Sequence, residues 1–104
     1  MKKIIASVLI LSCSLSFGSE VYKANCSKCH GDDGKGETAM GKRLSLKSLR
    51  SPEVQAKMSD DQMKDFIKKG LKDPDGKTKM KPYAELSELE IKEIVKYVRS
   101  LKSP

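Results

Sequence analysis

The stretch Cys26-Ser27-Lys28-Cys29-His30 decides what the rest of the chain can be. On a helical turn, Cys26, Cys29 and His30 occupy positions i, i+3 and i+4, so their side chains leave the backbone from one face. This is the C-x-x-C-H spacing for covalent attachment of a c-type haem. The sequence therefore predicts one haem c, bonded to the thiols of Cys26 and Cys29, with the imidazole of His30 bound to the iron.

A C-x-x-C pair also occurs in thiol redox modules, zinc sites and structural disulfides. A thiol redox module needs a βαβ context, and the chain has no alternating β-rich run. A zinc site needs a second pair of ligands, but His30 is the only histidine and Cys13 lies in an apolar leader. Haem attachment is therefore favoured, and a thiol redox module is the alternative without haem.

The N-terminus has the features of an export signal. Met1-Lys2-Lys3 is basic, residues 4–11 form an apolar run too short to span a bilayer, and Ser16-Phe17-Gly18 offers small residues to a signal peptidase. We expect residues 1–18 to be a signal peptide, removed by cleavage after Gly18, and residues 19–104 to form a periplasmic domain. The alternative is a lipid anchor on Cys13, because residues 10–13 resemble a lipobox. No segment of the mature chain is predicted to cross a membrane.

A domain of this size, with few aromatic residues and no tryptophan, is close to the limit at which one apolar core stabilises a fold. Small domains of this kind usually need a covalent link or a bound group. A buried haem supplies apolar surface, restricts the unfolded chain through two thioethers, and couples ligation to folding. We therefore expect the chain to be largely unfolded without haem.

Helix signals occur in four places, and no strand is predicted. Ser19 can cap a first helix that carries Tyr22, Cys26 and Cys29 on one face, and the glycine-rich residues 31–36 end it. Ser51-Pro52 can start a short helix.

Two later helices have stronger signals. Ser59 with Gln62 forms a capping box, flanked by Met58 and Met63 as a hydrophobic staple, and predicts a helix over residues 60–69 that ends at Gly70. A second capping box starts the last helix, whose apolar stripe is expected to face the core. Tyr97 beside this stripe is expected to pack near Tyr22 of the first helix. The box consists of Ser87 and Glu90, and the stripe consists of Ile91, Ile94, Val95, Val98 and Leu101.

A chain with one histidine must take its sixth iron ligand from another residue type, and methionine is the obvious source. Met58 and Met63 already flank a helix cap, and Met40 lies in a glycine-flanked loop only ten residues beyond His30. Met80 follows the turn signal of residues 73–76 and precedes a proline, which predicts a stiff, non-helical segment. Met80 is the favoured ligand and Met40 the alternative.

Five segments together resemble the small class I monohaem cytochromes c of bacterial periplasms. The resemblance covers nearly all of residues 19–102 and implies an all-α fold of about four helices wrapped around one covalently bound haem, with crossing N- and C-terminal helices. It also implies His30 and Met80 as axial ligands, and a single-electron carrier in place of an enzyme. The segments are residues 21–31, 33–36, 67–71, 80–83 and 94–101.

The sequence departs from this family at two points. Members often carry a proline after the glycine-rich loop, and its carbonyl accepts the Nδ1 proton of the ligand histidine; residues 40–44 contain no proline. We expect another backbone carbonyl of this stretch to bond His30, because such a bond fixes the tautomer and tunes the basicity of the ligand. The methionine loop reads Met80-Lys81-Pro82, whereas the proline more usually follows the methionine directly.

Removal of Lys2 and Lys3 with the leader lowers the net charge from +7 to +5. Several lysines surround the proposed haem edge, which predicts docking to the acidic face of an oxidase, peroxidase or reductase. A basic stripe with interleaved aromatics is missing, so a nucleic-acid partner is not expected, and we expect a monomer. A haem enzyme or gas sensor with a labile sixth ligand is the alternative function, although a second histidine for acid-base work is missing. The lysines are Lys28, Lys35, Lys77, Lys79 and Lys81.

Overall fold

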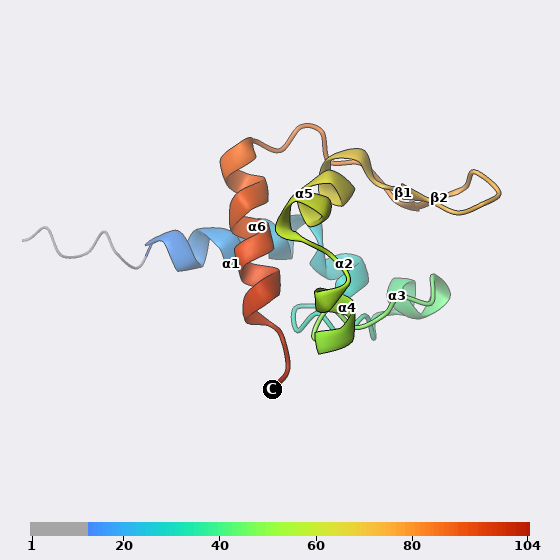
Figure 1. Cartoon of the computed structure of the whole chain (residues 1–104), viewed down its shortest axis with the longest axis horizontal. Helices are drawn as coiled ribbons and strands as arrows, with labels where there is room; N and C mark the ends of the chain where they lie inside the picture. The colour runs from blue at the N-terminus through green and yellow to red at the C-terminus, as the bar shows by residue number, and fades with distance from the viewer. Residues whose placement is uncertain (1–12) are drawn as a thin grey trace, which may run out of the picture.

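The computed structural model describes residues 13–104, which fold around two crossed helices (Figure 1). Helix α1 (Cys13–Asn25) packs across helix α6 (Glu88–Ser100). The two backbones approach closely at Gly18, where an added Cβ would lie 3.0 Å from the carbonyl oxygen of Glu93. A residue without a side chain therefore allows the close crossing, and the predicted crossing of the N- and C-terminal helices is confirmed.

Two tyrosines pack against each other beside this crossing. The ring centroids of Tyr22 and Tyr97 lie 4.9 Å apart, with the ring planes tilted by 49°. Such offset aromatic pairs stabilise a fold by about 0.5–1.5 kcal/mol beyond the apolar area that they bury. The prediction that Tyr97 packs near Tyr22 is confirmed.

The start of α1 differs from the sequence prediction. Ser19 lies inside the helix, because α1 continues N-terminally through Gly18 to Cys13, so the assignment of Ser19 as the N-cap is wrong for the uncut chain. Packing of Gly18 against α6 favours the longer helix. A cap signal is local and carries no information on this packing. Residues 1–12 of the predicted leader lie outside the described residues. Cleavage after Gly18 stays a prediction, and it would shorten α1 and remove the contact of Gly18 with Glu93.

Both predicted capping boxes are confirmed. The Ser59 side chain accepts from the backbone N–H of Gln62, whose side chain accepts from the backbone N–H of Ser59, and α5 (Asp60–Lys69) begins there. The same reciprocal pair of hydrogen bonds between Ser87 and Glu90 starts α6. Each box satisfies two backbone donors that a helix start leaves without partners, so both helices begin where the sequence predicts.

Three short helices connect the long ones. α2 (Ser27–His30) carries the end of the C-x-x-C-H motif, and α4 (Pro52–Ala56) begins after Ser51, as predicted. α3 (Ala39–Arg43) was not predicted, and it places Met40 in a helix where the sequence predicts a loop. The described part of the chain therefore has six helices in place of about four, and the all-α class is confirmed.

A small hairpin is the second unpredicted feature. β1 (Leu71–Lys72) pairs antiparallel with β2 (Thr78–Met80), and the hairpin projects from the helical body (Figure 1). The predicted turn lies at its tip, where the Asp73 carboxylate accepts from the backbone N–H groups of Asp75 and Lys77. Met80 is thus non-helical, as predicted, but it ends a strand in which it pairs with Leu71.

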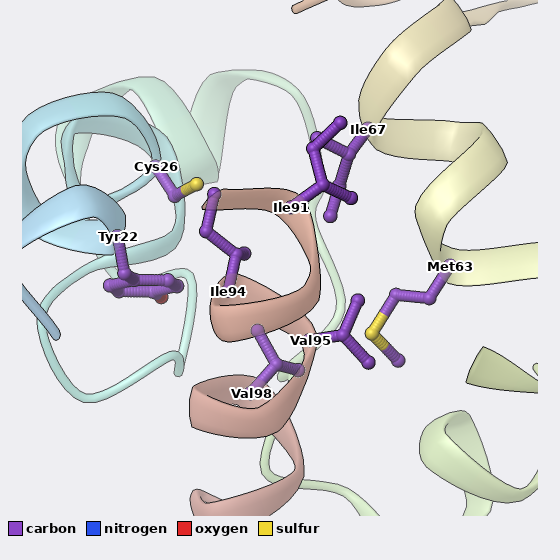
Figure 2. Close-up of a cluster of buried hydrophobic side chains, with 8 residues drawn as sticks. All are labelled: Tyr22, Cys26, Met63, Ile67, Ile91, Ile94, Val95 and Val98. Atoms are coloured by element: carbon purple, nitrogen blue, oxygen red, sulfur yellow. The ribbon is translucent and has the colours of Figure 1, made fainter. Parts of the chain in front are cut away.

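The core is a single small cluster on both sides of α6 (Figure 2). Ile94 points toward Cys26 of the C-x-x-C-H motif, and Val95 points toward Met63 of α5. No helix within residues 13–104 combines the length and apolar character needed to span a membrane. The buried cluster consists of Tyr22, Cys26, Met63, Ile67, Ile91, Ile94, Val95 and Val98.

Candidate haem-binding site

An apolar cavity of about 370 Å³ lies beside this core. Its walls come from α1, α2, α4, α5, α6, the segment between α3 and α4, and the hairpin, and its volume is in the range of about 300–1,000 Å³ usual for cofactor sites. A larger hollow of about 660 Å³ lies beside α4 but contains no cysteine, histidine or methionine. The cavity walls consist of Tyr22, Cys26, His30, Lys47, Leu49, Val54, Lys57, Met58, Met63, Phe66, Ile67, Leu71, Met80, Ile94 and Val98.

Two large hydrophobic side chains of this wall are exposed. Phe66 is 36 % exposed and Leu71 is 44 % exposed, although both lie in the cavity lining. Apolar side chains that stay exposed at the wall of an apolar cavity favour a binding site there. A large planar apolar group in the cavity would cover both side chains.

The backbone carries the C-x-x-C-H motif through a tight helical turn at the cavity wall. The Cys26 N–H donates to the carbonyl of Tyr22 (2.7 Å), and the His30 N–H donates to the carbonyl of Cys26 (2.9 Å). Cys26 and His30 both line the cavity, whereas Cys29 is partly exposed and lies outside the lining. Neither cysteine is in a disulfide. The turn therefore brings Cys26 and His30 into one cavity wall, and the place of Cys29 on the same face stays a prediction.

The pKa values of Cys26 and His30 are both shifted by burial. Burial, with the neighbouring Cys29, raises the pKa of the Cys26 thiol to about 11. Catalysts of thiol–disulfide exchange need the opposite, a thiol whose pKa is lowered toward neutrality. Burial lowers the pKa of His30, which keeps its imidazole in the neutral form that binds metals.

Nδ1 of His30 lacks the hydrogen-bond partner that the sequence predicts. Nδ1 of His30 is buried and has no hydrogen-bond acceptor within residues 13–104, so the expected carbonyl of residues 40–44 does not bond it. The neighbouring carbonyls bond other groups: Gly31 accepts from the Tyr22 hydroxyl, and Cys29 accepts from the Thr38 hydroxyl, both at 2.7 Å.

Three of the methionines reach the cavity, and Met40 does not. Met58, Met63 and Met80 belong to its lining. Met40 lies on α3, where its sulfur accepts a hydrogen bond from the Arg43 guanidinium at 3.7 Å. The cavity therefore has a histidine from the C-x-x-C-H turn and a methionine from the hairpin in its walls. This donor set, with the free thiols and the apolar walls, fits a haem c.

Thr38 and Gly41 support the C-x-x-C-H turn, and neither was predicted from the sequence. Besides donating to Cys29, the Thr38 hydroxyl accepts from the Gly41 N–H at 2.8 Å. A Cβ added to Gly41 would lie 2.3 Å from the carbonyl oxygen of Gly36 and 2.6 Å from that of Cys29. The cap signal of Thr38 could have indicated α3, but no local pattern shows that α3 packs on the C-x-x-C-H turn.

Gly41→Ala should lower the free energy of unfolding of the holoprotein by about 1–3 kcal/mol, because the new methyl group must push α3 away from two carbonyls. Helix propensity alone favours alanine, so any loss is steric. Thermal or denaturant unfolding followed by circular dichroism measures the change. The control is Lys42→Ala on the exposed face of α3, for which we expect little change. Equal stabilities of the two variants would contradict the close packing of α3.

Crossed terminal helices around an apolar cavity, with C-x-x-C-H in its wall, define a small c-type cytochrome. The family model described as cytochrome c oxidase, cbb3-type, subunit III matches residues 15–98. The chain therefore belongs to this family of c-type cytochrome domains, which use covalently bound haem c in electron transfer.

Solved structures agree with this family. The chain is similar to the KustC0563 c-type cytochrome, with 33% identity and a TM-score of 0.70, over 83% of this chain and 98% of that one. It is also similar to a tyrosine-to-phenylalanine mutant of Kustc0563, with 32% identity and a TM-score of 0.66, over 82% and 98%. No curated protein sequence matches the chain.

Proposed function

We propose that the protein is a periplasmic single-electron carrier with one haem c, attached through Cys26 and Cys29 and ligated by His30 and Met80. The observation that carries the proposal is an apolar cavity, within the described residues, whose walls contain Cys26, His30 and Met80. When bound, the haem iron supplies the one-electron redox chemistry. The protein is then a carrier without a substrate site, and the exported domain acts as a monomer.

The roles of the chain's own residues follow from the C-x-x-C-H motif and from the cavity lining. The thiols of Cys26 and Cys29 would anchor the haem at the end of α1, and the His30 imidazole would bind its iron. Met80 would supply a thioether ligand, which favours the ferrous state. The apolar walls exclude water and so limit the reorganisation that each electron transfer requires.

The lining gives little support to the alternative of a haem enzyme. Its charged side chains are Lys47 and Lys57, and the lining contains no carboxylate and no histidine besides His30. Proton transfer in haem enzymes needs an acid-base group placed at the open iron position. A closed iron site for electron transfer therefore fits these walls better.

Intact mass spectrometry of the exported protein tests attachment and processing together. The proposal predicts the mass of residues 19–104 plus one haem. The mass of the chain without haem would contradict the attachment. A haem-bearing mass that includes Gly18, or a lipid on Cys13, would move the processing site and leave the haem proposal intact.

The lysines of the hairpin are proposed to guide the carrier to an acidic partner. Lys77, Lys79 and Lys81 are exposed around Met80, and Lys28 is exposed on α2 beside the thiols. Positive charge at the haem edge would steer this edge toward the acidic face of an oxidase, peroxidase or reductase. Electron transfer needs only a brief encounter, so the charge should act on the association rate.

The bimolecular electron-transfer rate with an acidic partner should fall roughly tenfold from low to high ionic strength, because salt screens charges over about 8 Å at physiological concentration. Glutamate at both Lys77 and Lys79 should flatten this slope. The matched control reverses Lys92 and Lys102, which are exposed outside the hairpin and the cavity lining. Equal salt slopes for both double variants would show that the hairpin does not guide docking.

A further inference from the structure

Tyr83 connects the methionine segment to the haem-binding turn. Its hydroxyl donates a hydrogen bond of 2.7 Å to the carbonyl oxygen of Asn25, the last residue of α1. Asn25 directly precedes Cys26, so the bond ends at the backbone that presents the first thiol. Tyr83 itself lies three residues after Met80.

The same segment is fixed on its other side to the end of α5. The backbone N–H of Tyr83 donates to the carbonyl oxygen of Ile67 at 2.9 Å, and Met80 pairs with Leu71 in the hairpin. The segment also packs tightly on Gly70, where an added Cβ would lie 2.4 Å from the carbonyl oxygen of Met80. These contacts hold the backbone of the segment to the end of α5. The hydrogen bond of the Tyr83 hydroxyl holds the segment to α1.

We propose that Tyr83 is a positioning residue that fixes the Met80 segment at a set separation from the C-x-x-C-H turn, and so keeps the Met80 sulfur on the haem iron. This inference rests on the proposed function, in which Met80 is the sixth ligand. In the open state that we infer, the segment has moved away from the C-x-x-C-H turn, and this movement breaks the bond from Tyr83 to Asn25. The hydroxyl therefore stabilises the closed state of the site relative to the open one.

Tyr83→Phe is the direct test, because it keeps the ring and removes only the hydroxyl. A hydrogen bond of ordinary net strength shifts the closed–open balance about fivefold. Exogenous imidazole competes with Met80 for the ferric iron, so imidazole should bind the ferric Tyr83→Phe holoprotein about fivefold more tightly than the wild type. Titration followed in the visible spectrum measures this affinity.

Tyr97→Phe is the control. It also removes a tyrosine hydroxyl that donates to a backbone carbonyl, that of Asp32 at 3.4 Å, and Tyr97 lies outside the cavity lining. We expect Tyr97→Phe to leave the imidazole affinity unchanged. Wild-type affinity in Tyr83→Phe, or an equal rise in both variants, would overturn the positioning role.

Met80→Ala separates this inference from the proposed ligation. If imidazole binds Met80→Ala far more tightly than wild type while Tyr83→Phe shows wild-type affinity, Met80 is the ligand and only the role of Tyr83 fails. If Met80→Ala also keeps wild-type affinity, the ligation fails, and the role of Tyr83 fails with it. A large rise in Met80→Ala with a smaller rise in Tyr83→Phe supports both.

Discussion

Alanine at both Cys26 and Cys29 should give a protein that holds no haem covalently and remains largely unfolded. Cys26 is only 8 % exposed and belongs to the core cluster, so attachment and core formation share the same residue. Each large apolar side chain contributes about 1.5–3 kcal/mol when it is fully buried. Without haem, several lining side chains would be exposed to water. Their loss of burial would remove much of the roughly 5–15 kcal/mol free energy of unfolding of a typical domain.

Haem staining after denaturing gel electrophoresis measures covalent attachment, and far-ultraviolet circular dichroism measures the fold. Ser27→Ala is the control within the same motif, because the buried Ser27 hydroxyl has no hydrogen-bond partner in the described residues. We expect this variant to stain and fold like the wild type. Haem that stays on the double cysteine variant through denaturation would refute attachment at these thiols.

Met80→Ala should keep the haem attached but open its sixth position. Loss of the thioether should lower the reduction potential by on the order of 100 mV, part of the roughly 0.8 V range that axial ligands set. The reduced variant should also bind carbon monoxide readily, whereas the wild type should resist it. Potentiometric titration and carbon monoxide difference spectra measure the two effects.

The other methionines provide controls for this variant. Met40→Ala changes a side chain outside the cavity, and we expect it to keep the wild-type potential. Met58 and Met63 line the cavity, so alanine at either position should alter packing while the sixth ligand stays in place. A wild-type spectrum in Met80→Ala, with an open site in Met58→Ala or Met63→Ala, would assign the sixth ligand to that residue.

Local signals predicted where α5 and α6 begin. The capping boxes at Ser59 and Ser87 are closed by side chains three residues away, so the sequence alone contains both partners. The hairpin escaped prediction because β1 has two residues and β2 has three, too few for an alternating pattern. The cap signal of Thr38 could have indicated α3, but the packing of Gly41 on Cys29 depends on a contact that no local pattern encodes.

Only those parts of the candidate site that depend on local sequence motifs were predicted. The C-x-x-C-H spacing places Cys26 and His30 in one wall, and the turn before Met80 indicates a non-helical segment. The sequence did not show that Met58 and Met63 share the cavity, since their place depends on how α5 packs against α6. The long-range bond of Tyr83 to Asn25 likewise has no local sign.

The central claim is that His30 and Met80 are the two protein ligands of the haem iron. The visible spectrum of the oxidised wild-type protein tests this claim most directly. The account predicts haem absorption with a sulfur-to-iron charge-transfer band that disappears in Met80→Ala. A haem spectrum without this band in the wild type would contradict Met80 ligation, and a protein without haem absorption would contradict the whole account.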